Sequence, residues 1–158
     1  MASNTLLAGV SQFLKEHPPF SMMANADVEF VARNVEVAYY SRGEVLIGPD
    51  DGAPAACFII KQGLVEGLRR RPDRPEAELE PTVQRVPGEM LPISALMAQR
   101  PVMSTYRAAG DVFCWLLPKA RFDELLQRSP VFLDFCKRRM ASLLDLSHQA
   151  LQASYAAG

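Results

Sequence analysis

The chain has 158 residues, of which 49% are apolar and 22% charged, and its formal net charge is -1. These values predict one globular domain over residues 1–158 with enough chain to bury a core. They argue against a nucleic-acid partner, whose binding surface normally carries a basic excess or stripe. No apolar run approaches the roughly 18 residues of a membrane-spanning helix, and the N-terminus lacks a signal-peptide pattern, so we expect a cytoplasmic protein without a membrane partner.

Two helices are predicted within residues 1–33. Asn4 or Thr5 can cap the first helix, whose apolar residues recur at helical spacing. The sequence His-Pro-Pro-Phe at residues 17–20 ends that helix, and a second helix is expected over about residues 25–33.

The hydrophobic period changes at Val35 from helical to alternating, which predicts strands. Glycines at positions 43, 52 and 63 fall between short apolar runs, where a positive φ lets the chain turn a corner. The most apolar run, residues 112–117, predicts a strand that is buried on both faces. Strands are expected at residues 35–40, 45–47, 57–61, 64–69, 82–86, 104–108 and 111–117.

Residues 70–81 contain three prolines and several charges, which predicts an exposed loop between two hairpin strands. The cationic run from Arg69 to Arg74 overlaps the start of this stretch. It is interpreted as a solvated loop, with a polyanion site as the alternative.

The three cysteines, Cys57, Cys114 and Cys136, show neither metal-ligand spacing nor an even disulfide framework. A catalytic thiol would need an electropositive, accessible setting and a nearby histidine. Because both histidines lie near the chain ends, the cysteines are interpreted as buried packing residues.

The stretch from residue 86 to residue 108 has the order expected of a ligand-binding segment. A strand residue and a Pro-Gly turn precede a short helix predicted over Pro92–Ala98, and a second strand follows from Ser104. Proline suits the first position of a helix because it has no N–H group to leave unpaired there. The free N–H groups of Ser94 and Ala95 would then point outward, where helix N-termini bind anions.

This stretch resembles the phosphate-binding cassette of cyclic-nucleotide-binding domains, in which roughly Gly-Glu-Leu-Ala-Leu is followed by Pro-Arg-Ala-Ala-Thr and a strand. Ile93 stands where the family has its ribose-binding glutamate, and Val102 stands where it has its phosphate-binding arginine. The resemblance therefore implies the family's fold with a degenerate pocket. The matching positions are Ser94, Ala95, Leu96, Pro101, Ser104 and Thr105.

Two further helices are predicted after the last strand. Pro118 opens the first, and Ser129-Pro130 starts the longest helix, which extends to about Ser154. An apolar stripe along it, from Phe132 to Leu151, is longer than one barrel can cover. We therefore expect a homodimer through this helix, or contact with a following domain.

The resemblance implies a mainly β, α+β fold: an antiparallel β-roll or jelly-roll-like barrel over residues 35–117, with N-terminal helices at 1–33, a short helix inside the cassette and C-terminal helices at 118–155. This variant looks most like the degenerate domains of bacterial signal-transduction proteins, which often precede CBS-type and nucleotidyltransferase-like domains. Because these 158 residues contain no helix-turn-helix after it, we do not expect the transcription-factor branch of the family.

Three classes of function stay open. The first is a regulatory ligand-sensing module without a cofactor, whose partner is a cyclic nucleotide or another small anion and in which Arg100 or Arg107 replaces the missing cation. The second is a ligand-free scaffold, or a dimerisation or interaction module. An enzyme is not expected, since no carboxylate pair, nucleophile-histidine set or metal cluster occurs at useful spacing. The candidate ligand-binding residues are Glu89, Pro92, Ile93, Ser94, Ala95, Arg100, Ser104 and Thr105.

Overall fold

The computed structural model describes residues 2–69 and 80–141. Its N-terminal part contains α1 (Ala2–Lys15), the short 3-10 helix η1 (Phe20–Met22) and α2 (Asn25–Asn34). The two predicted helices are therefore present. The expected cap is wrong, because α1 begins at Ala2 and places Asn4 and Thr5 inside the helix. No helix-breaking residue stands between Ala2 and the first leucines, so nothing delays the start.

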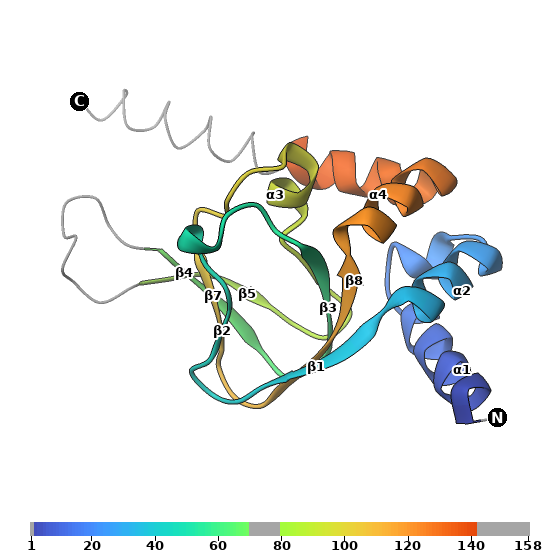
Figure 1. Cartoon of the computed structure of the whole chain (residues 1–158), viewed down its shortest axis with the longest axis horizontal. Helices are drawn as coiled ribbons and strands as arrows, with labels where there is room; N and C mark the ends of the chain where they lie inside the picture. The colour runs from blue at the N-terminus through green and yellow to red at the C-terminus, as the bar shows by residue number, and fades with distance from the viewer. Residues whose placement is uncertain (1, 70–79, 142–158) are drawn as a thin grey trace.

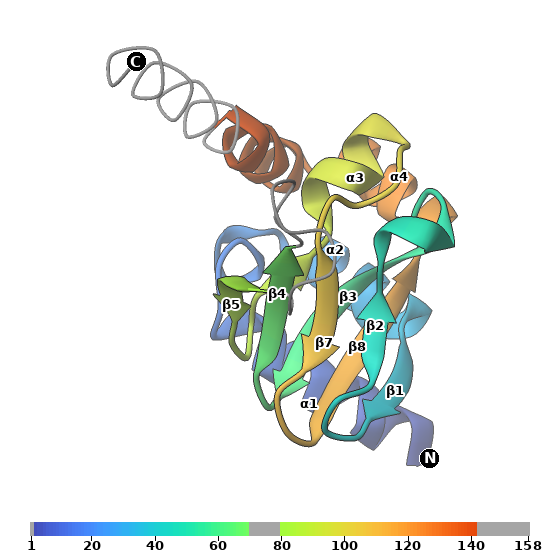
Figure 2. The ribbon, with the colours of Figure 1, turned by 90° about the vertical axis from the view of Figure 1, so that its left-hand side faces the viewer.

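Two four-stranded antiparallel sheets form the centre of the described structure (Figure 1). Figure 2 shows the second sheet facing the viewer, with the first behind it. The first sheet has the order β1 (Glu36–Tyr40), β8 (Val112–Pro118), β3 (Ala56–Gln62) and β6 (Met90–Leu91). The second has the order β2 (Val45–Ile47), β7 (Thr105–Ala108), β4 (Val65–Arg69) and β5 (Glu80–Arg85). The predicted mainly β, antiparallel roll is thus confirmed, as two facing sheets rather than a closed barrel.

Strand β5 begins earlier than the sequence predicts. Pro81, expected in the loop, lies in this strand opposite Leu68, next to a register shift between Gly67 and Leu68. A proline is tolerated there because β5 is an edge strand and its neighbour is irregular at that point. The rest of the expected loop, with most of the cationic run, lies outside the described residues.

Strand β3 is buried on both faces and divides the core in two. Cys57 and Ile59 pack toward the helices, whereas Phe58 and Ile60 pack between the two sheets. This split follows from the alternation of side chains along a strand. Strand β8 divides in the same way, which confirms the prediction that its apolar run is covered on both sides.

The C-terminal helices pack over one end of the sheets, beside the short helix of the cassette (Figure 1). Helix α4 (Lys119–Arg128) is followed by a helix whose described part covers residues 130–141. The buried Ser129 begins it, since its Oγ accepts a hydrogen bond of 3.1 Å from the N–H of Phe132. The predicted start at Ser129-Pro130 is therefore confirmed, whereas the predicted end near Ser154 lies outside the described residues.

All three cysteines are buried and free, as predicted. Burial raises the pKa of the Cys114 and Cys136 thiols to about 12, and it raises the pKa of Cys57 further. These thiols are therefore protonated packing groups at neutral pH.

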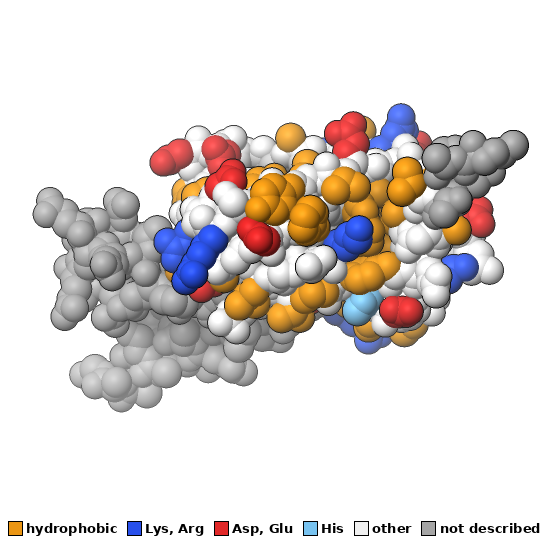
Figure 3. Space-filling model, turned by 90° about the horizontal axis from the view of Figure 1, so that it is seen from below, with side chains coloured by type: hydrophobic (Ala, Val, Ile, Leu, Met, Phe, Trp, Pro, Cys, Tyr) orange, Lys and Arg blue, Asp and Glu red, His pale blue; other side chains and the backbone are white. Residues whose placement is uncertain are grey.

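The outer face of β1 is apolar. Val37 and Tyr39 are exposed, and the Tyr39 hydroxyl donates a 2.7 Å hydrogen bond to Asp111 while its ring lies against Phe113. The view from below shows hydrophobic side chains gathered on this side of the molecule (Figure 3). In the described part of the chain, no helix is long and apolar enough to cross a membrane, and no group of acidic, histidine and cysteine residues could hold a metal ion.

Candidate functional site

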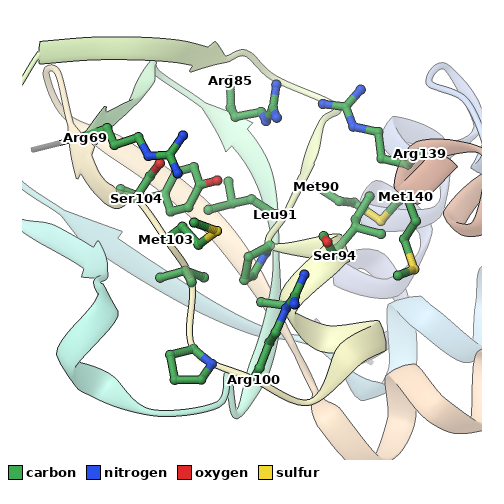
Figure 4. Close-up of a pocket in the computed structure, with 16 residues that line it drawn as sticks. Arg69, Arg85, Met90, Leu91, Ser94, Arg100, Met103, Ser104, Arg139 and Met140 are labelled. Carbon is green, nitrogen blue, oxygen red and sulfur yellow. The ribbon is translucent and has the colours of Figure 1, made fainter. Parts of the chain in front are cut away.

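A cavity of about 290 Å³ lies between the cassette, the second sheet and the helix over residues 130–141 (Figure 4). Its lining combines basic, hydroxyl and apolar side chains, and none of the lining residues that the structure describes is acidic. The polar lining residues are Arg69, Arg85, Ser94, Arg100, Ser104, Tyr106 and Arg139, and the apolar ones are Met90, Leu91, Pro92, Ile93, Ala95, Pro101, Val102, Met103 and Met140.

Helix α3 (Ile93–Ala98) forms one wall of this cavity. The predicted helix is present, but Pro92 is its N-cap rather than its first helical residue, with an extended φ of -96° and ψ of 96°. Its carbonyl accepts the N–H of Leu96 at 3.0 Å. The helix ends at Gln99, whose left-handed φ of 53° turns the chain toward the second half of the cassette.

Six of the eight candidate residues line the cavity: Pro92, Ile93, Ser94, Ala95, Arg100 and Ser104. Thr105 does not line it, because Ser104 and Tyr106 lie on one face of the chain and Thr105 alternates to the other. Its hydroxyl lies beside Gly48 instead, 3.6 Å from where a Cβ on that glycine would stand.

Glu89 also lies outside the cavity lining. Its carboxylate accepts the N–H of Val86 at 3.2 Å and lies 3.7 Å from the Arg85 guanidinium. It therefore stabilises the turn before β6 and forms an ion pair with Arg85 from outside the cavity.

The two departures from the family pattern are both buried. Ile93 belongs to the core beside the helices, Val102 belongs to the core between the sheets, and each is 6% exposed. Neither side chain can accept or donate a hydrogen bond. The cassette therefore offers a ligand no charged side chain at either position.

Positive charge comes from other elements instead. Arg69 at the end of β4, Arg85 at the end of β5 and Arg139 on the C-terminal helix join Arg100 around the cavity. Figure 4 shows the ends of Arg85 and Arg139 extending toward each other. Burial, and then the neighbouring charge of Arg139, lower the pKa of Arg85.

Sequence reasoning missed three of these four arginines. Arg107, which it offered as a replacement cation, is paired with Glu66 at 3.2 Å and does not line the cavity. Arg69 carried a weak signal, because it begins the cationic run. Arg139 carried none, since only tertiary packing brings its helix to the cassette.

A sequence model of the family described as cyclic nucleotide-binding domain matches residues 37–129. The chain belongs to this family. The match covers the strands, the cassette and α4, so the resemblance drawn from the cassette residues is confirmed at the level of the family. Cyclic nucleotide-binding domains are ligand-binding regulatory modules.

Solved structures of cyclic nucleotide-binding domains show the same fold. The regulatory domain of Toxoplasma gondii PKA with cAMP has a TM-score of 0.78 at 15% identity, covering 89% of this chain and 52% of that one. The catabolite activator protein of Thermus thermophilus has a TM-score of 0.73 at 17% identity, covering 84% and 60%. A regulatory subunit of a cAMP-independent protein kinase A from Trypanosoma cruzi, bound to guanosine, has a TM-score of 0.77 at 18% identity, covering 94% and 52%.

The chain spans about half the length of these regulatory subunits. A comparison with curated proteins gave no match.

Proposed function

We propose that this cyclic nucleotide-binding domain is a non-catalytic regulatory module that binds a small anionic ligand in the cavity beside the cassette. The observation that carries the proposal is the gathering of four arginines of the described residues around one cavity, in a chain whose net charge is -1. Such a concentration of one charge over a partly apolar floor is typical of a site for an organic anion.

Similar proteins support a ligand of the nucleotide type. The Toxoplasma gondii domain is in complex with cAMP, and the Trypanosoma cruzi subunit is bound to guanosine. One of these ligands is anionic and the other is neutral, so the fold accommodates ligands of different charge. In this chain the arginines favour the anionic kind.

A ligand-free scaffold or interaction module is the second candidate. It is favoured by the burial of Ile93 and Val102, which puts apolar side chains at both of the family's charged recognition positions. In this case the arginines would contribute to solubility or to contacts with a partner.

A thermal-shift panel of cyclic and linear nucleotides separates the two candidates. A ligand present at 100 times its dissociation constant stabilises a protein by about 2.7 kcal/mol, which for a chain of this size raises the melting temperature by roughly 5 to 10 °C. The sensor function predicts such a rise with at least one nucleotide. A panel without any rise, repeated by calorimetry at millimolar ligand, supports the scaffold.

The wider setting belongs to the same proposal. We place the domain in a bacterial signal-transduction protein located in the cytoplasm, where three free buried thiols are expected to stay reduced.

Its C-terminal helix would pair with a second copy or contact a following domain. Leu143, in the middle of the apolar stripe, lies outside the described residues, and Leu143→Glu should shift a dimer toward monomer in light scattering. If the wild type is already monomeric at high concentration, only the alternative that the helix contacts a following domain is left.

A further inference from the structure

The charges around the cavity exceed what a singly charged ligand needs. Among the described residues, four guanidinium groups line the cavity, and a single carboxylate, that of Glu89, lies against one of them from outside the lining. The side chain of Arg85 is only 14% exposed, so solvent does little to screen it.

Two of these arginines, Arg85 and Arg139, are placed so that both can bind the same anionic group. Arg85 comes from the second sheet and Arg139 from the helix over residues 130–141, and their ends extend toward each other (Figure 4). Like charges facing each other across a cavity repel when nothing lies between them. An anion with several acceptor oxygens would let both guanidinium groups form bidentate hydrogen bonds.

The remainder of the lining fits the body of such a ligand. Met90, Leu91 and Met140 supply an apolar surface, and Ser94 and Ser104 supply hydroxyls. The volume of about 290 Å³ lies just below the range of roughly 300 to 1,000 Å³ for small-molecule sites. The lining of the cavity thus combines four arginines with an apolar surface suited to a nucleobase or another flat apolar group.

Building on the proposed sensor function, we infer that this cavity selects nucleotides with a terminal phosphate over cyclic phosphodiesters, and that Arg85 and Arg139 bind the terminal phosphate. A terminal phosphate carries a charge of about -1.5 to -2 at neutral pH, whereas a cyclic phosphodiester carries only one negative charge. The terminal group also presents three oxygens to the two arginines.

Calorimetry on the full chain tests this inference, with AMP, ADP, GMP and GDP compared with cAMP and cGMP. We expect at least one linear nucleotide to bind 10-fold or more tightly than its cyclic counterpart. Cyclic nucleotides that bind as tightly as the linear ones would overturn the inference while leaving the sensor function intact. If no nucleotide of either class binds, both the inference and the sensor function fail.

Variants of single arginines locate the site. Arg139→Gln should weaken linear-nucleotide binding at least 10-fold and change cyclic-nucleotide binding less. Arg138→Gln is the matched control, because this neighbour is 81% exposed, is paired with Asp134 at 2.9 Å and does not line the cavity. Arg85→Gln gives a second measurement from the sheet side, with circular dichroism to verify its fold. Equal affinities for wild type and Arg139→Gln would show that the phosphate binds elsewhere and would overturn the assignment.

Discussion

Replacement of Phe132 by alanine tests how the helix over residues 130–141 is held against the rest of the molecule. The Phe132 ring is fully buried and lies 5.5 Å from the ring of Phe122 in an edge-to-face arrangement and 6.2 Å from that of Phe20. Deletion of a buried phenylalanine costs about 3 to 5 kcal/mol because it leaves a cavity. The lost aromatic pairs account for about 0.5 to 1.5 kcal/mol each beyond area burial, so we expect a value near the upper end of that range.

Urea unfolding followed by circular dichroism measures this loss as a lower midpoint with an unchanged slope. The expected drop in melting temperature is on the order of 10 °C. Val131→Ala is the control on the same helix, since Val131 is exposed, and it should change stability by less than about 1 kcal/mol. A loss below about 1 kcal/mol for Phe132→Ala would refute the reasoning, because it would mean that the ring is not packed into the core.

Four further predictions concern the site, one turn and the thiols. Ile93 and Val102 replace charged groups whose hydrogen bonds are worth about 1.5 to 3 kcal/mol each. The affinity of this chain for cAMP and cGMP should therefore be roughly 10² to 10⁴-fold lower than that of a cassette with both charged groups. Sub-micromolar affinity in calorimetry would contradict this. Gly63→Ala should lower the free energy of unfolding, measured in urea, by more than about 1 kcal/mol. Gly63 has a φ of 98°, and a Cβ at this position would stand 2.3 Å from the carbonyl oxygen of Asp111. Gly110→Ala is the control, because a Cβ there meets nothing within 4 Å. Because burial raises the pKa of all three thiols, a disulfide reagent at neutral pH should label them only after unfolding, and rapid labelling of the native protein would count against their burial. The same shifts predict that stability falls as pH rises above the unfolded thiol pKa of about 8.5.

Most elements of this fold were predictable because they have a local signal, whereas the two-residue strand β6 (Met90–Leu91) was not predicted. Alternating apolar residues mark the strands, and the dipeptide at Ser129-Pro130 marks the last helix because both the hydroxyl cap and the proline favour a helix start. Element boundaries depend on context that the sequence does not show. Pro81 could enter a strand only because that strand is at an edge, and Pro92 took the cap position because the preceding strand β6 runs directly up to it.

The lining of the candidate site was predictable only where one continuous stretch forms it. Six of the eight candidates reach the cavity because the cassette is local in sequence, and strand alternation removes Thr105. Arg69, Arg85 and Arg139 come from three separate elements, and no spacing between them foretells their meeting. Only the packing of the C-terminal helix beside the cassette brings the last of them to the rim.

Because the helix over residues 130–141 packs beside the cassette, residues from two parts of the molecule line the cavity. Arg139 and Met140 belong to the C-terminal helix, whereas Arg69 and Arg85 belong to the sheet. An occupant that touches both parts adds its contacts to those that hold the helix down. The two binding events are then thermodynamically linked. A partner that binds the helix only when it is displaced must lower the affinity of the cavity for its occupant, and the occupant must lower the affinity of that partner by the same factor. Force or binding at the helix would then be transmitted to the cavity as a change in affinity, without any movement inside the sheets.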